Sequence, residues 1–209
     1  MRLERVTKLA QALLYEGFLL YPYRASSVKN QQRWTFGTLY PRSFAEAQDE
    51  ADPWWMRTEC LVQGGEDTEL EVCVRFLHLL EPEAHERQIE TPTRAFGQLK
   101  EVSKSEVFEL NLGEETSSTR ARVEVGVEQI GDSLFKVIVH VCNLSPFVMR
   151  PADSRETRRQ AALRCALAST HAILAVRGGT FVSLVDPPAP LREVAARCEN
   201  VGVWPVLVG

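Results

Sequence analysis

Apolar and polar positions alternate with a period of two through much of the chain, as in strands that bury one face. Between residues 120 and 130, Val123, Val125 and Val127 alternate with charged or small residues, which gives this segment one dry and one wet side. The same criterion predicts strands over residues 33–40, 55–62, 69–80, 107–112, 120–130, 134–144, 172–176, 181–185 and 203–208. Because antiparallel sheets commonly bury one face and solvate the other, the pattern favours a mainly antiparallel sheet.

Glycine-containing turns separate several of these predicted strands and favour hairpins. They lie at residues 64–67, at Gly131-Asp132 and at Gly178-Gly179. The polar stretch 81–93 resembles a solvated loop or short helix and is the best candidate for an interior linker. We therefore expect a single α+β domain over residues 1–209, a mainly antiparallel sheet built from hairpins with a few covering helices.

The period changes to that of a helix in three places. Residues 3–20 form the first predicted helix, and residues 191–199 form the last. The middle helix begins at Asp153, which with Glu156 resembles a capping box, and apolar positions continue its pattern as far as Thr170. His171 then follows the predicted helix end, where a histidine is expected to stabilise the terminus or to pack against it.

Composition narrows the class of protein. Hydrophobic residues make up 44% of the 209 residues and charged residues 25%, which are ordinary globular values. A net charge of -4 provides no basic field for general nucleic-acid binding. No apolar run approaches the roughly 18 residues of a membrane span. Five scattered cysteines without a Cys-x-x-Cys pair indicate reduced thiols, so we expect a cytoplasmic protein.

The strongest candidate for a binding surface is an aromatic and cationic turn near the N-terminus. It has no acidic residue after Glu16, although the chain as a whole is acidic. Aromatic and arginine side chains are enriched at recognition surfaces, because they combine large contact area with directed hydrogen bonds. About half of the aromatic side chains here are expected to pack in the core. We predict that a protein partner or a small anion binds at Tyr21, Tyr23, Arg24, Lys29, Asn30, Arg33 and Trp34.

Two arrangements would suit an enzyme. Ser26 and Lys29 have the serine-x-x-lysine spacing that can activate a hydroxyl on a helix, although the companion motifs of the penicillin-recognising enzymes are absent. His140 and Cys142 share one face of a predicted strand, about 7 Å apart, as two metal ligands could. Core packing is the more common role for such a pair. We therefore expect no metal and no cofactor, and we keep a hydrolase or a metal-dependent enzyme as the alternative.

Three segments resemble an uncharacterised bacterial family whose members tend to be encoded beside nickel-iron hydrogenase structural and maturation genes. They are residues 14–41 (LYEGFLLYPYRASSVKNQQRWTFGTLYP), 181–188 (FVSLVDPP) and 200–209 (NVGVWPVLVG). The resemblance covers most of the chain, and it implies no catalytic residues. It implies a non-catalytic accessory protein for assembly or maturation of a redox metalloenzyme, with a hydrogenase subunit or maturation factor as partner.

The C-terminal residues 203–208 are apolar and β-prone, and Pro205 lacks an amide hydrogen, so we expect a strand at a sheet edge. Such an edge would allow a homodimer through this strand. The resemblance implies that family members continue past this segment, and the abrupt end leads us to expect that the chain lacks a tail.

Overall fold

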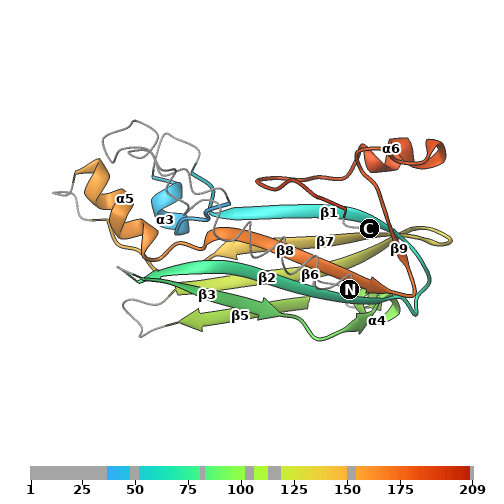
Figure 1. The fold of residues 1–209 in the computed structure, drawn as a ribbon, viewed down its shortest axis with the longest axis horizontal. Coiled ribbons are helices and arrows are strands. Elements are labelled where there is room, and N and C mark those ends of the chain that lie inside the picture. Colours follow the sequence, from blue (N-terminus) through green and yellow to red (C-terminus); the bar gives the residue numbers. More distant parts are fainter. Residues whose placement is uncertain are drawn as a thin grey trace.

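The computed structural model describes residues 37–47, 52–80, 83–101, 106–112, 119–149 and 154–207. Within this part, the chain forms mostly antiparallel sheet with a few short helices, which agrees with the predicted α+β class. Two sheets pack face to face along the long axis of the molecule (Figure 1). No helix in these ranges is both long and apolar enough to cross a membrane.

Five strands form the first sheet in the order β5 (Glu106–Leu112), β6 (Thr119–Gly131), β7 (Leu134–Asn143), β1 (Trp55–Gln63) and β9 (Thr180–Val182). The second sheet contains β3 (Glu83–Glu90), β2 (Glu69–Leu80), β4 (Arg94–Ala95) and β8 (Ala168–Arg177). The helices are α3 (Arg42–Ala45), α4 (Phe96–Glu101), α5 (Arg155–Leu163) and α6 (Arg192–Ala195), the last preceded by the 3-10 turn Ala189–Leu191. Figure 1 shows α3 and α5 at one end of the two sheets and α4 at the other.

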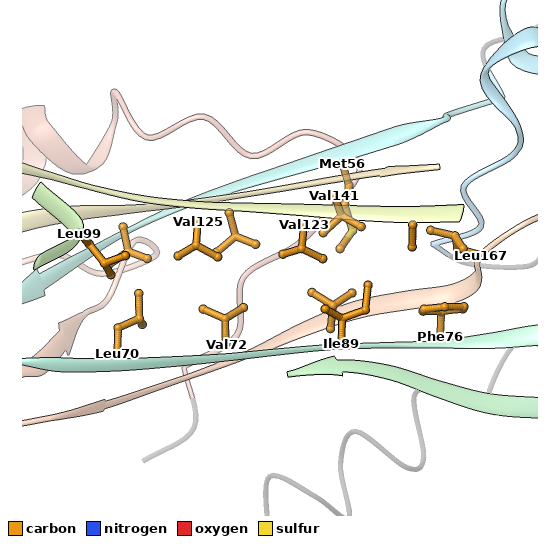
Figure 2. Close-up of a cluster of buried hydrophobic side chains, with 14 of the residues drawn as sticks. Met56, Leu70, Val72, Phe76, Ile89, Leu99, Val123, Val125, Val141 and Leu167 are labelled. Carbon is orange, nitrogen blue, oxygen red and sulfur yellow. The ribbon is translucent and has the colours of Figure 1, made fainter. Parts of the chain in front are cut away.

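The alternating valines predicted from the sequence form the core between the sheets. Val123 and Val125 of β6 face Leu70 and Val72 of β2 across the interlayer space (Figure 2). All four side chains are at most 3% exposed. Because successive side chains of a strand point to opposite faces, this burial leaves the charged residues of β6 on the outer face.

Of the three predicted hairpins, the turn at Gly131-Asp132 joins two strands that do pair with each other. β6 and β7 run antiparallel with Val125 opposite Val139. The other two predictions were wrong, because β1 and β2 lie in different sheets, as do β8 and β9. A glycine-rich turn ends a strand equally well when the chain crosses to a second layer, so turn composition could not separate the two cases.

Thr68 connects these two crossing turns. Its hydroxyl accepts a hydrogen bond from the backbone N–H of Gly65 at 3.0 Å and donates to the carbonyl of Gly178 at 3.2 Å. The side chain is fully buried. The two glycine-rich turns therefore pack against each other through one threonine.

Three further local predictions need correction. The stretch predicted as a loop or short helix around residues 81–93 contains β3, which pairs with β2. Helix α5 ends at Leu163 and is capped by Ser154, so the predicted continuation to Thr170 was wrong. Leu167 instead exchanges backbone hydrogen bonds with Leu39, and β8 follows at once. His171 consequently lies on a strand and not at a helix end.

A buried asparagine holds three segments together where β7 ends. The Asn143 side-chain amide donates to the carbonyls of Leu39 and Cys165 at 2.8 and 2.9 Å. Its side-chain oxygen accepts from the backbone N–H of Ser145 at 2.9 Å. Every polar atom of this fully buried side chain thus has a partner, which is the condition under which a buried amide stabilises a fold.

We predict that Asn143→Ala lowers the free energy of unfolding by roughly 3 kcal/mol, since three backbone groups each lose a hydrogen bond to a fully buried side chain. Urea denaturation measures this value. Asn111→Ala, at an exposed position of β5, is the matched control and should change stability little. A similar small effect for both variants would contradict the assigned role of Asn143.

Candidate functional site

The predicted binding residues Tyr21, Tyr23, Arg24, Lys29, Asn30, Arg33 and Trp34 lie outside the described residues. Ser26 and Lys29 of the hydrolase alternative lie outside them as well. The candidate site is therefore built from the outer face of the five-stranded sheet, where His140 and Cys142 lie, and from the C-terminal segment beside it.

His140 and Cys142 are brought together as predicted. The Cys142 sulfur lies 3.5 Å from His140 Nε2, and Glu124 on β6 lies 3.5 Å from His140 Nδ1. The ring of Trp55 meets the imidazole edge-on, with centroids 5.3 Å apart. Cross-strand pairing explains this grouping, because β7 places His140 between Glu124 and Arg57.

The thiol of Cys142 is poorly suited to nucleophilic or metal chemistry. Burial, helped by the Glu124 carboxylate, raises its pKa to about 11, although Arg122 and Arg42 oppose part of the change. Cys60 is similar, since burial raises its pKa to about 12. The thiolate is the form that attacks substrates and binds metals, so both side chains are almost entirely in the inactive form at neutral pH.

A metal site needs several ligands that converge. Within the described ranges, no group of three or more His, Cys, Asp and Glu side chains could hold a metal ion. His140 and Cys142 therefore supply two candidate ligands at most, whereas structural zinc sites use four.

An open hollow lies on the same outer face, toward β5. Its wall includes Glu109, Arg120, Arg122 and Leu144. Arg122 is already engaged, because its guanidinium donates to the Glu109 carboxylate at 2.8 Å. Among the described residues, the hollow thus presents the Arg122–Glu109 ion pair and Arg120, for which no ion pair is seen, and no arrangement of an acid, a base and a nucleophile.

The edge of β1 that faces away from β7 is closed by three different structures. β9 pairs with the end of β1, opposite Leu61 and Gln63. Val201 forms a single antiparallel bridge with Arg57, with backbone hydrogen bonds of 3.0 and 2.9 Å. Between them, the side chain of Asn200 takes the place of a neighbouring strand at Glu59.

The Asn200 amide pairs with both backbone groups of Glu59. Its side-chain oxygen accepts from the Glu59 N–H at 3.3 Å, and its nitrogen donates to the Glu59 carbonyl at 3.3 Å. The Thr58 hydroxyl donates to the same side-chain oxygen at 2.7 Å. We call residues 198–202 the C-terminal strap, since this segment seals the β1 edge.

The Glu59 carboxylate fixes the strap from the outer face of the sheet. It accepts from the backbone N–H of Glu199 at 3.0 Å and from the Arg57 guanidinium at 3.1 Å. The side chain is only 3% exposed. Burial by itself raises the pKa of Glu59, but the Glu199 amide, Arg57 and Lys136 together outweigh it, so the pKa lies below its ordinary value.

Beyond the strap, residues 203–207 form neither a strand nor a helix. Gly202 adopts a φ of +69°, in the left-handed region that favours glycine, and redirects the chain away from β1. Val203 still packs against the core, whereas Trp204 and Val206 are 82% and 67% exposed. The strand predicted for residues 203–208 is therefore not formed over residues 203–207.

The sequence analysis missed both Glu59 and Asn200. Glu59 carried a weak signal, since it is an acidic residue in the middle of a predicted strand. Asn200 carried none, because its role depends on a strand about 140 residues earlier in the chain.

Comparison of the chain with protein-family models, with curated proteins and with solved structures finds no match. The geometry of the site therefore has to support any functional conclusion.

We predict that Glu59→Gln lowers the free energy of unfolding at pH 7 by about 2 kcal/mol, because Arg57 loses its buried anionic partner. The folded-state pKa of Glu59 is depressed, so its contribution exists above the unfolded pKa and disappears as pH falls through the folded pKa. Urea denaturation at pH 7 and near pH 3 should therefore show a larger difference from wild type at pH 7 than near pH 3. Glu128→Gln is the control, as this carboxylate is 55% exposed and should contribute little. A difference of equal size at both pH values would contradict the ionic role of Glu59.

Proposed function

We propose that the chain is a non-catalytic accessory protein for assembly or maturation of a redox metalloenzyme such as nickel-iron hydrogenase, acting in the cytoplasm by protein recognition. The family resemblance supports the biological context. The outward-facing apolar segment after the strap supports recognition, and it is the observation on which the proposal rests.

Residues 203–207 have the features of a strand that lacks a neighbour. Their backbone groups make no hydrogen bond within the described part of the molecule. Trp204, Val206 and Leu207 are all more than half exposed. Segments of this kind add readily to the strand of a partner, with backbone hydrogen bonds giving affinity and side chains giving specificity.

Trp204 is the natural anchor of this surface. Tryptophan is enriched among the few residues that carry most of the binding energy at protein interfaces. Pro205 has no N–H to donate, so a partner strand would pair on either side of it. The partner is a hydrogenase subunit or maturation factor, and the same segment allows a homodimer.

The alternative is a hydrolase or a metal-dependent enzyme of unknown substrate. The protonated state of Cys142 at neutral pH argues against the metal-dependent form, and within the described ranges no group of three possible ligands could hold a metal ion there.

We predict that Trp204→Ser weakens binding to a purified hydrogenase large subunit at least tenfold without lowering the melting temperature, because it removes an exposed anchor and no core contact. Val185→Ser is the matched control, as Val185 is also 80% exposed but lies outside the segment. Surface-based binding assays give the affinity, and sedimentation velocity gives the solution mass for the homodimer. If wild type and Trp204→Ser bind equally and have equal mass, this segment is not the recognition surface.

A further inference from the structure

The outer face of the five-stranded sheet carries two neighbouring rows of side chains where β5 pairs with β6. One row sets Glu109 opposite Arg122, and the other sets Asn111 opposite Arg120. All four side chains project to the outer face, because Ala121 between the two arginines is buried in the interlayer core. The rows therefore differ in one respect, since the first contains a carboxylate and the second an amide.

The first row holds a paired charge. The Arg122 guanidinium donates to Oε1 of Glu109 from Nε at 2.8 Å and from a terminal nitrogen at 2.6 Å. A guanidinium on this face of β6 is thus placed to bind a carboxylate above β5.

The second row has the cation without the anion. Within the part of the chain that the structure describes, the Arg120 side chain forms no ion pair and no hydrogen bond. Only its backbone N–H is engaged, donating to the Ser145 hydroxyl at 2.9 Å. The Asn111 side chain makes no hydrogen bond in this part either, and both side chains are exposed. Donors from two strands are therefore available side by side.

The unpaired row borders the hollow on this face, which has a volume of about 330 Å³. Leu144 forms its wall on the β7 side, where the Leu144 backbone N–H donates to the Arg120 carbonyl at 2.8 Å. Small-molecule sites begin at roughly this volume and combine an apolar wall with a few polar groups that fix orientation. The hollow therefore suits a ligand of few atoms with one anionic end.

We propose that this hollow binds the carboxylate of a small organic acid. The carboxylate takes at Arg120 the place that Glu109 takes at Arg122, and it accepts from the Arg120 guanidinium and from the Asn111 side-chain amide. Charge-assisted hydrogen bonds of this kind are among the strongest in proteins, and the planar guanidinium matches a planar carboxylate. The apolar end of the acid lies against Leu144.

The hollow favours a single negative charge. The Glu109 carboxylate lines the same hollow and repels a second charge on the ligand, so a monocarboxylate is preferred to phosphate. The site lies on the β5 side of the sheet, whereas Trp204 follows the strap at the β1 edge. Acid binding therefore does not rest on the proposed protein recognition, and Trp204→Ser should leave it unchanged.

The test is an NMR titration of the full chain at pH 7 with sodium propionate, at ionic strength held constant with sodium chloride. We expect saturable shifts of the Arg120 Nε–H and the Asn111 side-chain amide. A parallel titration with sodium phosphate should show weaker binding, and phosphate binding as tight as that of propionate would overturn the carboxylate assignment.

Arg120→Gln should weaken propionate binding at least tenfold, because it removes the only unpaired cation of the hollow in the described structure. Arg197→Gln, at an exposed arginine outside the hollow, is the matched control and should leave binding unchanged. Melting temperatures check that both variants are folded.

A second pair of variants tests the same site from β5. Asn111→Asp supplies an internal carboxylate opposite Arg120 and should also weaken propionate binding at least tenfold, whereas Asn111→Gln keeps the amide and should weaken it less. Both changes are at an exposed position and should leave the fold intact. Absence of saturable shifts in wild type, or equal affinities of the Arg120 and Arg197 variants, would overturn the proposal.

Discussion

The edge of β1 that does not pair with β7 is the constraint on which the fold of the C-terminal segment depends. Every buried backbone N–H and carbonyl needs a partner, and β1 offers its second set of these groups at Arg57, Glu59, Leu61 and Gln63. The three-residue strand β9 pairs with only the last two of these residues, Leu61 and Gln63. The strap pairs with Arg57 through a backbone bridge and with Glu59 through the side chain of Asn200. The Glu59 carboxylate in turn binds the backbone of the strap. An exposed strand edge can pair with another chain. By closing the β1 edge, β9 and the strap prevent such pairing at β1.

The distribution of polar groups separates structural from functional features. Asn143 is fully buried and fully paired, and its role is therefore structural. Arg87 retains a buried Nε without a hydrogen-bond partner in the described structure, on the interlayer face of the second sheet. An unpaired buried group of this kind lowers stability. On the outside of the molecule, the apolar segment after Gly202 also lacks partners in the described structure, since its backbone makes no hydrogen bond there and Trp204 is exposed.

Strand positions could be predicted from the sequence because alternation is a local signal. The bounds expected for β1, β2, β6 and β7 agree with the structure to within a residue or two. Pairing depends on contacts distant in sequence, and both glycine-rich turns beside Thr68 join strands of different sheets. The helix after Ser154 was predicted too long, because an apolar run ending near Leu167 fits a strand equally well. The site residues of the strap could not be predicted, since Asn200 acts only when folding brings it to Glu59.

Native-state hydrogen exchange at the β1 amides tests the closure of this edge most directly. The N–H groups of Arg57 and Glu59 point to the strap, whereas those of Met56 and Thr58 point to β7. If the strap seals the edge, all four amides are protected to a similar degree, within about a factor of ten. Exchange of Arg57 and Glu59 orders of magnitude faster than that of Met56 and Thr58 would show an open edge and contradict the account.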